Sequence, residues 1–423
     1  MNIIVAGTGT AGLLSASILK HTIPDANVTI IDGGDGVIGV GEGTFGSFIE
    51  TLRDKAGVNI FDLVNDIDPV AKYGVELDFG KDKFHYTFDR VFDWWYKNEK
   101  LPVGFNFEGG NYGNSPFSNN MINKSGIKPF SNQHALHLNN EKWLVFMRKH
   151  AKNLGVNIIK DNITSIERTG DIITSINNKY KADYYIDCTG FKGLLTKSKW
   201  MPFKKLINDR ALFFITENDH PIRPYTVATT MNSGWFWEID HMNRTGNGYV
   251  YSSKFITDEE AKNEIECKLG KNVNGKVIKF RTGRRDKQWE GNVITIGNSG
   301  NFIEPLESTS IDIILHNTIG LSNILKTGVN DYMIDRYNKE MNERLDNMAD
   351  FIAIHFIYNK KLDTDYWKYY NKLNVDKGTL ADDIIEYYRH NNTNIVMTTK
   401  FYSDVNPFGV EGWYSILRGL DVN

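Results

Sequence analysis

The sequence predicts an α/β fold that combines a parallel sheet with a second, antiparallel sheet. Three observations predict it. The apolar run 2–6 is followed by a glycine-rich turn, a helical pattern and a second apolar run, 28–32, which is typical of a βαβ unit. Two further apolar runs, 182–187 and 293–296, also end in glycine turns. Finally, apolar residues alternate within 231–254, which predicts an antiparallel hairpin with a large aromatic face.

The first glycine turn has the spacing of a dinucleotide-binding motif. Gly7 permits a tight turn, Gly9 lets a pyrophosphate approach the backbone, and Gly12 lets the helix pack on the strand. Asp32 ends the next strand, where it can accept hydrogen bonds from ribose hydroxyl groups. The pattern predicts a Rossmann-like domain, whereas the alternative is a βαβ turn whose glycines serve packing alone. The motif residues expected at the cofactor are Gly7, Gly9, Thr10, Ala11, Gly12 and Asp32.

The later glycine turns favour FAD over NAD. They are spread over about three hundred residues, which suggests one extended cofactor threaded through a discontinuous domain, although each turn could also end a strand without touching a ligand. We expect this domain to comprise residues 1–80, 140–200 and 275–330, with a substrate-side sheet from 81–139 and 201–274 and a helical region from 331–423. The further residues expected at the cofactor are Gly41, Glu42, Asp187, Gly190, Gly297 and Asn298.

Composition excludes several classes of function. The net charge of -3 gives no reason to expect nucleic acid or an anionic membrane as a partner. Only Cys188 and Cys267 are present, so a disulfide framework or a zinc cluster is excluded, no metal is expected, and a reduced, cytoplasmic protein is predicted. No apolar stretch approaches the length of about 18 residues that spans a membrane, and the N-terminal apolar run is interpreted as a strand and not as a signal peptide.

The segment 302–310 places an acid beside several hydrogen-bond donors. Glu304 and Glu307 straddle a proline, so at least one carboxylate is expected to face a cleft. Ser308 adds a hydroxyl group, and the backbone N–H groups of Thr309 and Ser310 can bind an anion where a helix begins. The simpler alternative is a solvated loop that caps the helix.

Several of these motifs together resemble those of flavin-dependent tryptophan halogenases. Trp235-Phe-Trp237-Glu-Ile239 is similar to the family's WxWxIP segment, and the match continues through Gly248-Tyr-Val-Tyr-Ser-Ser-Lys254. Residues 7–12 and 39–44 resemble its flavin turns, 187–195 its D-C-S/T-G-x-x-G-L-L segment, and 302–310 its FxEPLEST segment. The resemblance covers nearly the whole chain. It implies an FAD-binding domain like that of p-hydroxybenzoate hydroxylase.

The resemblance also implies a function. The protein would be a two-component, FADH2-dependent halogenase that makes hypohalous acid from flavin hydroperoxide and a halide: chloride, bromide or iodide. Reduced FAD would come from a separate flavin reductase, and the halide would bind at Thr309 and Ser310. Lys72, in Ala71-Lys72-Tyr-Gly-Val-Glu-Leu77, matches the family's catalytic lysine, although a lysine at a strand start is usually solvated. Glu307 would orient the electrophile or take the ring proton, and Ser308 would position Glu307 or the adjacent backbone.

The implied substrate is a small, electron-rich aromatic molecule such as an indole or tryptophan-like compound. The expected pocket residues lie in or near the C-terminal region, where the segment 332–372 is predicted to form an amphipathic helical layer on the surface. Two residues depart from the family pattern: Asp240 replaces a proline and is expected to be a flexible acid, and Ser310 stands where glycine is commoner. A homodimer is expected from the family alone. The candidate pocket residues are His355, Tyr402, Phe408, Glu411 and Trp413.

Two other functions fit parts of this pattern. An FAD-dependent monooxygenase would hydroxylate or epoxidise its substrate, although Lys72 and Glu307 beside the aromatic strand argue against it. A catalytically silent flavin-binding homologue is made plausible by Asp240, by Ser310 and by a C-terminal region shorter than that of typical members.

Overall fold

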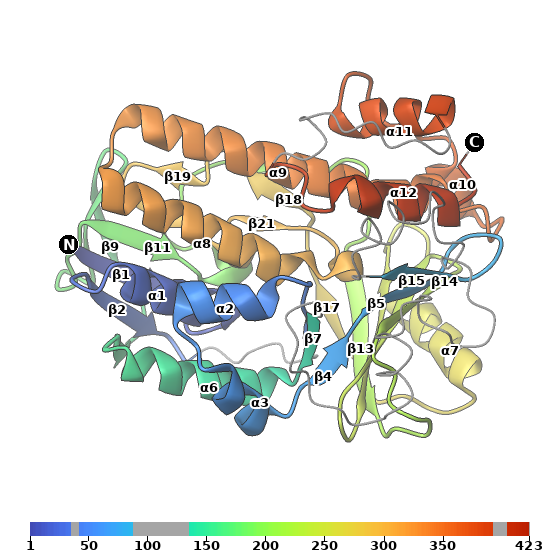
Figure 1. Cartoon of the computed structure of the whole chain (residues 1–423), viewed down its shortest axis with the longest axis horizontal. Helices are drawn as coiled ribbons and strands as arrows, with labels where there is room; N and C mark the ends of the chain where they lie inside the picture. Colours follow the sequence, from blue (N-terminus) through green and yellow to red (C-terminus); the bar gives the residue numbers. More distant parts are fainter. Residues whose placement is uncertain (35–41, 88–134, 392–403, 423) are drawn as a thin grey trace, which may run out of the picture.

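The structure is a computed structural model, and it describes residues 1–34, 42–87, 135–391 and 404–422. The predicted residues Gly41 and Tyr402 lie outside these ranges. Figure 1 shows two β-sheets side by side, with the long helices α8 and α9 along one face of the molecule. Within the described residues, no helix has the length and apolar character needed to cross a membrane.

The first sheet has the predicted parallel architecture. Its strand order is β19-β20-β11-β1-β2-β8, with parallel pairing from β20 to β8 and an antiparallel edge strand, β19. The three strands that precede glycine turns, β1, β11 and β20, are neighbours, so their carboxyl ends meet at one edge. The strands are β1 (Asn2–Ala6), β2 (Asn27–Asp32), β8 (Asn157–Lys160), β11 (Tyr184–Asp187), β19 (Trp289–Glu290) and β20 (Val293–Thr295).

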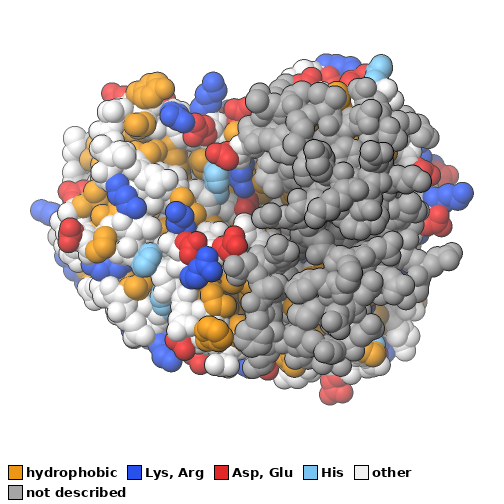
Figure 2. Space-filling view, viewed as in Figure 1, with side chains coloured by type: hydrophobic (Ala, Val, Ile, Leu, Met, Phe, Trp, Pro, Cys, Tyr) orange, Lys and Arg blue, Asp and Glu red, His pale blue; other side chains and the backbone are white. Residues whose placement is uncertain are grey.

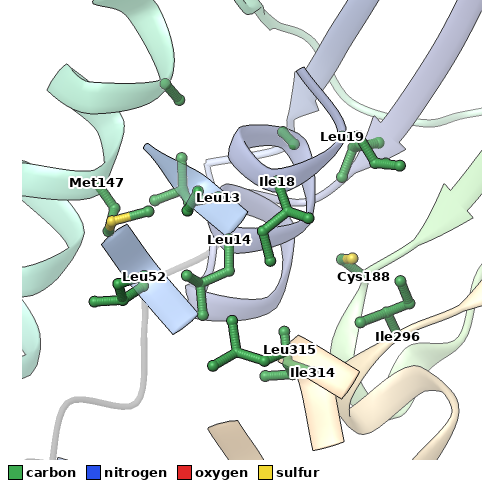
Figure 3. Close-up of a cluster of buried hydrophobic side chains, with 14 of the residues drawn as sticks. Leu13, Leu14, Ile18, Leu19, Leu52, Met147, Cys188, Ile296, Ile314 and Leu315 are labelled. Atoms are coloured by element: carbon green, nitrogen blue, oxygen red, sulfur yellow. The ribbon is translucent and has the colours of Figure 1, made fainter. Parts of the chain in front are cut away.

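Helix α1 (Thr10–Thr22) lies at the centre of the core that covers one face of this sheet. Figure 3 shows its apolar side chains, among them Leu14 and Ile18, pointing toward three other helices and toward Cys188 and Ile296. Residues from Gly12 to Leu19 are all buried, so the short apolar pattern seen in the sequence is a helix enclosed on all sides. The surrounding helices are α2 (Phe48–Ala56), α6 (Asn140–Asn153) and α8 (Thr309–Thr327), with α3 (Ile60–Ile67) beside α6.

The second sheet has the order β17-β13-β16-β15-β14-β5-β6 and is antiparallel except between β14 and β5. The predicted hairpin is confirmed, since β15 and β16 pair from Gly234↔Tyr251 to Asp240↔Thr245. Strands β5 and β17 lie just outside the expected limits of this sheet. The strands are β5 (Gly74–Asp78), β6 (Phe84–Thr87), β13 (Arg210–Thr216), β14 (Thr226–Met231), β15 (Gly234–Asp240), β16 (Thr245–Tyr251) and β17 (Lys276–Lys279).

The two faces of the second sheet belong to different cores. Trp235, Trp237 and Ile239 face the largest core, which they share with the C-terminal helices. Phe236 and Tyr249 face the opposite side, where they pack with residues of α7 (Asp258–Leu269). The alternation in the sequence therefore divides the aromatic side chains between two cores.

Small sheets complete the β structure. The sheet β3-β7-β4 is formed by β3 (Glu42–Gly43), β7 (Ala135–Leu138) and β4 (Val70–Lys72), and the chain leaves it directly for β5 of the second sheet. The others are formed by β12 (Trp200–Met201), β18 (Gly283–Arg285) and β21 (Asn301–Phe302), and by β9 (Ile166–Thr169) and β10 (Ile172–Ile176); three 3-10 turns are η1 (Gly190–Lys192), η2 (Gly297–Ser299) and η3 (Pro305–Glu307).

Helix α9 (Asp331–Ile357) crosses from the first core to the second. Its Tyr337 and Met341 belong to the core beside α1, whereas residues from Leu345 onward belong to the core of the second sheet. The prediction of a surface layer is wrong for its second half, because Phe351 to Ile357 are all buried beneath the remaining helices. These helices are α10 (Asp365–Tyr370), α11 (Leu380–Asn391) and α12 (Gly409–Gly419).

Candidate functional site

The three glycine turns meet at the carboxyl edge of the first sheet. A Cβ atom added to Gly7 would lie 2.5 Å from the Cys188 carbonyl oxygen, and one added to Gly297 would lie 2.7 Å from Cβ of Ala11. The Ile296 N–H donates to the Asp187 carbonyl oxygen at 3.0 Å. Segments about three hundred residues apart therefore form one continuous surface, as expected for an extended cofactor.

The glycines of the first turn differ in the space around them. A Cβ atom on Gly12 would lie 2.0 Å from the Gly7 carbonyl oxygen, so this position tolerates only glycine. Around Gly9, the residue that precedes α1, a Cβ atom would meet nothing within 4 Å. Gly190 has a φ of 64° and is equally open. The turn is thus crowded toward the protein and open on the side where a pyrophosphate would lie.

Asp32 lies at the end of β2 among hydrogen-bond donors. Its carboxylate accepts from the Thr8 hydroxyl at 2.8 Å, from the Gly34 N–H at 3.0 Å and from Arg148 at 2.8 Å. Burial would raise the pKa of Asp32, but these hydrogen bonds outweigh burial and lower the pKa below its usual value. Arg148 comes from α6, and the sequence did not single it out because one arginine on an amphipathic helix carries no motif.

Asp187 is fully buried, and its own turn occupies its carboxylate. One oxygen accepts from the backbone and hydroxyl of Thr189, and the other accepts from the N–H groups of Leu195 and Thr196 at 2.7 and 3.1 Å. Asp187 thereby fixes the shape of the turn that contains Gly190. Asn298 lies in η2 beside Gly297, while nothing is described of the Glu42 side chain.

Lys72 is fully buried, unlike a typical lysine at a strand end. Its ammonium donates to the Ser308 hydroxyl at 2.6 Å and to the Thr44 carbonyl oxygen at 3.2 Å. Burial lowers the pKa of Lys72 to about 8, and the nearby Glu307 carboxylate opposes that change. Lys72 is buried because the chain passes between two sheets here: Lys72 pairs with Ala135, and the Tyr73 N–H donates to the Pro224 carbonyl oxygen.

The turn 305–308 presents Glu307 and Ser308 to Lys72. Ser308 adopts φ 58°, a left-handed conformation that costs a non-glycine residue roughly 1–3 kcal/mol. Its hydroxyl accepts a hydrogen bond from Lys72, while the expectation that Ser308 positions Glu307 or the adjacent backbone stays a prediction. Gly43 makes room for the pair, since a Cβ atom there would lie 2.5 Å from Ser308 Oγ.

Helix α8 begins directly after this turn. Ser308 is its N-cap, and the Ser308 side chain makes no capping hydrogen bond to the first turn, which is the positive end of the helix dipole. Thr309 is buried, and its hydroxyl has no hydrogen-bond partner among the described residues. These features belong to the two positions expected to bind halide, Thr309 and Ser310.

Glu304, the other acid of the turn, is part of a buried network. Its Oε2 accepts from the Trp235 indole N–H at 3.0 Å and from Asn208 at 2.8 Å. Burial raises the pKa of Glu304 to about 7, even though these two hydrogen bonds lower it. Tyr366 completes the network by donating to Asn208. Glu304 thus joins the turn to the aromatic face of β15, a function that the paired glutamates of the sequence only hinted at.

Asp240 is not the flexible acid expected from the sequence. It is fully buried and accepts from the backbone and guanidinium of Arg223 at 2.8–3.1 Å and from the Thr245 hydroxyl at 3.1 Å. Its carbonyl oxygen lies 3.1 Å from Nδ1 of His137, whose Nε2 lies 3.0 Å from the Thr226 hydroxyl. The end of β15 is therefore held rigidly, with ionic contacts in place of a proline ring.

The candidate substrate residues are packed in an aromatic cluster next to Glu307. Phe351 stacks on Phe408 with ring centroids 3.7 Å apart and meets Trp413 edge-on at 5.0 Å. Trp413 is fully buried, and its indole N–H donates to Asn406. His355 is also fully buried, and its Nε2 lies 3.2 Å from Glu307 Oε1. The Glu411 side chain lies outside the described part of the structure.

Comparison with known proteins decides the family. A family model described as tryptophan halogenase matches residues 2–423. The chain belongs to the tryptophan halogenase family. It is 28% identical over 443 residues to tryptophan 7-halogenase RebH of Lentzea aerocolonigenes, covering 92% of this chain and 81% of the relative. Tryptophan 6-halogenase SttH of Streptomyces toxytricini is 27% identical, covering 86% and 80%.

Solved structures of halogenases share the fold. The flavin-dependent halogenase Xcc4156 from Xanthomonas campestris superposes with a TM-score of 0.86 at 21% identity, covering 100% of this chain and 89% of that chain. MibH, described as a lathipeptide tryptophan 5-halogenase, superposes with a TM-score of 0.83 at 24% identity, covering 100% and 86%. The p-hydroxybenzoate hydroxylase-like α/β fold expected from the sequence agrees with this likeness.

Membership of the family makes the chain a flavin-dependent halogenase with FAD as its cofactor. The residues at the carboxyl edge of the first sheet fit that cofactor. The open backbone at Gly9 and Gly190 forms a cradle that any side chain would fill, and Asp32 offers carboxylate oxygens at the end of β2. The uncapped start of α1 lies in the same cradle, where a helix N-terminus favours a pyrophosphate.

Proposed function

We propose that Lys72 delivers the halogen to an electron-rich aromatic substrate and that Glu307 assists the substitution. The observation that carries this proposal is the burial of the Lys72 ammonium against Ser308, with Glu307 near enough to raise its pKa. Burying a lysine side chain costs free energy, so we expect a buried lysine where function requires it. Residues whose pKa values are shifted in this way cluster at functional sites. Bound reduced FAD, with oxygen, supplies the oxidising power that turns halide into hypohalous acid.

The residues of the chain then control that electrophile. Lys72 can donate a hydrogen bond to hypohalous acid while Ser308 and Thr44 fix the direction of the ammonium. The same amine can carry the halogen after losing its proton, which a pKa of about 8 brings within reach near neutral pH. Glu307 stabilises the cationic ring that forms on halogen addition and accepts the proton the ring must lose. We place the halide at the backbone N–H groups of Thr309 and Ser310, because the helix start there has no side-chain cap.

The substrate class that we propose is a small indole or tryptophan-like molecule. The relatives RebH and SttH are both named as tryptophan halogenases, and an aromatic cluster lies next to Glu307 in this chain. Phe351 and Phe408 stack directly on each other, so the substrate ring would lie at an edge of this cluster and not between them.

The remaining proposals concern the setting of the reaction. We infer a separate flavin reductase as the source of reduced FAD, because the sequence has no second nucleotide motif for NAD(P)H. We also propose a cytoplasmic enzyme, supported by two free cysteines, of which Cys188 is buried. A homodimer is proposed from the family alone. On the described part of the face in Figure 2, side chains of both charge signs are interspersed.

One experiment tests this function. The protein is incubated with FAD, a flavin reductase, NADH and chloride, bromide or iodide in turn, over a panel of indoles and phenols, and product masses are read. Replacement of hydrogen by halogen is expected, and Lys72→Ala should abolish it while FAD binding persists. A gain of oxygen without halide would identify a monooxygenase instead. FAD binding without any product across the panel would identify a silent homologue.

A further inference from the structure

We propose that His355 is a positioning residue for Glu307. It holds Oε1 of the Glu307 carboxylate through one shared proton and leaves Oε2 to take the proton that the aromatic ring loses. This inference rests on the proposed function, in which Glu307 is the base. To that function it adds His355 as a positioning residue, the charged state of the His355–Glu307 pair, and a separate role for each oxygen of the Glu307 carboxylate.

The tautomer of His355 follows from its two neighbours. The ring lies in the buried second half of α9, and Nδ1 is 2.9 Å from the Phe351 carbonyl oxygen one turn earlier. A carbonyl oxygen can only accept, so Nδ1 carries a hydrogen. The other nitrogen, Nε2, is therefore the one that meets Glu307 Oε1 at 3.2 Å.

The contact between Nε2 and Oε1 requires a second proton. If His355 were neutral and Glu307 ionised, the lone pair of Nε2 would face a negatively charged oxygen inside the protein, and both would be unsatisfied. One proton must therefore lie between the two atoms, shared by Nε2 and Oε1. Lys72, whose pKa the Glu307 carboxylate raises, in turn favours negative charge on that carboxylate. The pair therefore rests as imidazolium and carboxylate.

The two oxygens of Glu307 have different surroundings. Oε1 is engaged by His355, whereas Oε2 is buried and has no hydrogen-bond partner among the described residues. A buried carboxylate oxygen without a partner is expensive in a resting fold and is explained by a role in the reaction. When the ring regains aromaticity, the C–H bond at the halogenated carbon breaks. Its electron pair returns to the ring, and its proton binds Oε2.

The imidazole ring is held in place by aromatic edges. Phe351 meets the ring edge-on with centroids 5.2 Å apart. Phe79, which directly follows β5, also meets it edge-on, with centroids 6.3 Å apart. These contacts, together with the bond to the helix carbonyl, fix the ring orientation. Glu307 consequently presents Oε2 in one direction, which is what a positioned base requires.

The test compares His355→Leu, His355→Gln and the wild-type protein, with ring-deuterated and ordinary indole as substrates. Loss of the positioned base should make removal of the ring proton slow. We expect kcat of His355→Leu to fall by about 100-fold, the low end of general-base effects, with little change in KM. A primary deuterium isotope effect should appear in this variant and be larger than in the wild type. The amide of His355→Gln can donate one hydrogen bond to Oε1, so this variant should recover part of the rate.

Two controls separate this inference from the proposed function. His150→Leu removes a half-buried imidazole on α6 that also bonds a backbone carbonyl oxygen, that of Ala56, and it should leave kcat and the isotope effect unchanged. Hypohalous acid trapped in solution should form at the same rate in every variant. Unchanged kcat in His355→Leu, or a fall without an isotope effect, would overturn the inference alone. If His355→Leu does not retain FAD, the isotope effect of His355→Gln decides in the same way. Failure of the wild type to halogenate any aromatic would overturn both proposals.

Discussion

The Nζ atom of Lys72 lies 2.6 Å from the hydroxyl of Ser308, which is 236 positions further along the chain. The contact joins the small sheet β3-β7-β4 to the turn that starts α8. Each partner is unusual by itself: one is a fully buried ammonium, and the other is a serine in a left-handed conformation. Such departures from local preference are expected where function requires them.

Lys72→Met is expected to stabilise the fold while abolishing halogen transfer. The pKa of Lys72 falls from 10.5 to about 8 on folding, which corresponds to a penalty of at most about 3 kcal/mol. Between pH 8 and 10.5, Lys72 is protonated in the unfolded chain but mostly neutral in the folded protein, so the stability of the wild type rises with pH over this range. The advantage of Met should be complete below pH 8 and vanish above 10.5. Urea unfolding at several pH values, with product masses, measures both effects, and equal stability of the two proteins at pH 7 would contradict this account.

The rate of halogen transfer should depend on the protonation of Lys72. If the ammonium donates to hypohalous acid, kcat falls as pH rises through about 8, because burial sets the pKa of Lys72 there. Single-turnover measurements on preloaded protein between pH 6.5 and 9.5 would isolate this step from flavin reduction. A rate that increases over the same range would instead indicate transfer through the neutral amine.

Two glycines of the first turn should respond differently to alanine. Gly12→Ala would place a Cβ atom 2.0 Å from the Gly7 carbonyl oxygen, so we expect little folded protein. Gly9→Ala meets nothing within 4 Å, and it should fold with unchanged melting temperature but bind FAD at least tenfold more weakly. Fluorescence titration with FAD checks the second variant. Undiminished affinity would show that the cofactor does not approach this turn.

Asp240→Ala should destabilise the fold by about 1–3 kcal/mol, because a buried carboxylate with several charge-assisted hydrogen bonds is lost while the partly exposed Arg223 keeps Glu238 as a partner. The change leaves the guanidinium of Arg223 without the carboxylate that binds it at two points. Asp219→Ala, in the exposed loop before Arg223, is the matched control and should have little effect. Denaturant midpoints compare the two variants. Similar midpoints would mean that the contacts of Asp240 do not stabilise the fold.

Glu304→Gln should remove a pH dependence of stability. The pKa of Glu304 is about 7 in the folded protein and 4.5 as an ordinary glutamate, so folding favours its protonated form. Its contribution to stability is present below pH 4.5 and is lost as pH rises through 7. The glutamine variant should therefore melt higher than the wild type at pH 8 and similarly at pH 5. Glu340→Gln, on the exposed face of α9, controls for the loss of a surface charge.

Much of the fold was accessible from the sequence because local patterns determine it. The run before Gly7 and the alternation around Trp235 are each set by burial of neighbouring residues, and both appear as predicted. The predicted residues Lys72, Glu307 and Ser308 lie together, although the roles assigned to them remain predictions. Family motifs, and not residue chemistry, identified Lys72.

The errors have a common physical cause. Asp240 looked flexible because its partner, Arg223, lies 17 positions away and carries no motif. Glu304 received no role because its proton donors come from β15 and from Asn208, which only the folded chain brings to it. The second half of α9 looked like a surface layer because α10 and α12, which cover it, are separate from it in sequence. Long-range contacts of this kind leave no local pattern.

The helix α9 contributes to the cores on both sides of the molecule. Residues near Tyr337 anchor it beside the nucleotide-binding half, and residues near His355 anchor it beneath the aromatic half. Because α9 is one uninterrupted helix with residues buried in both cores, it opposes a hinge motion between the two halves. Under the proposed function, this helix would keep the distance between the oxidant and the aromatic substrate constant, and we expect heating to melt both halves in a single cooperative event.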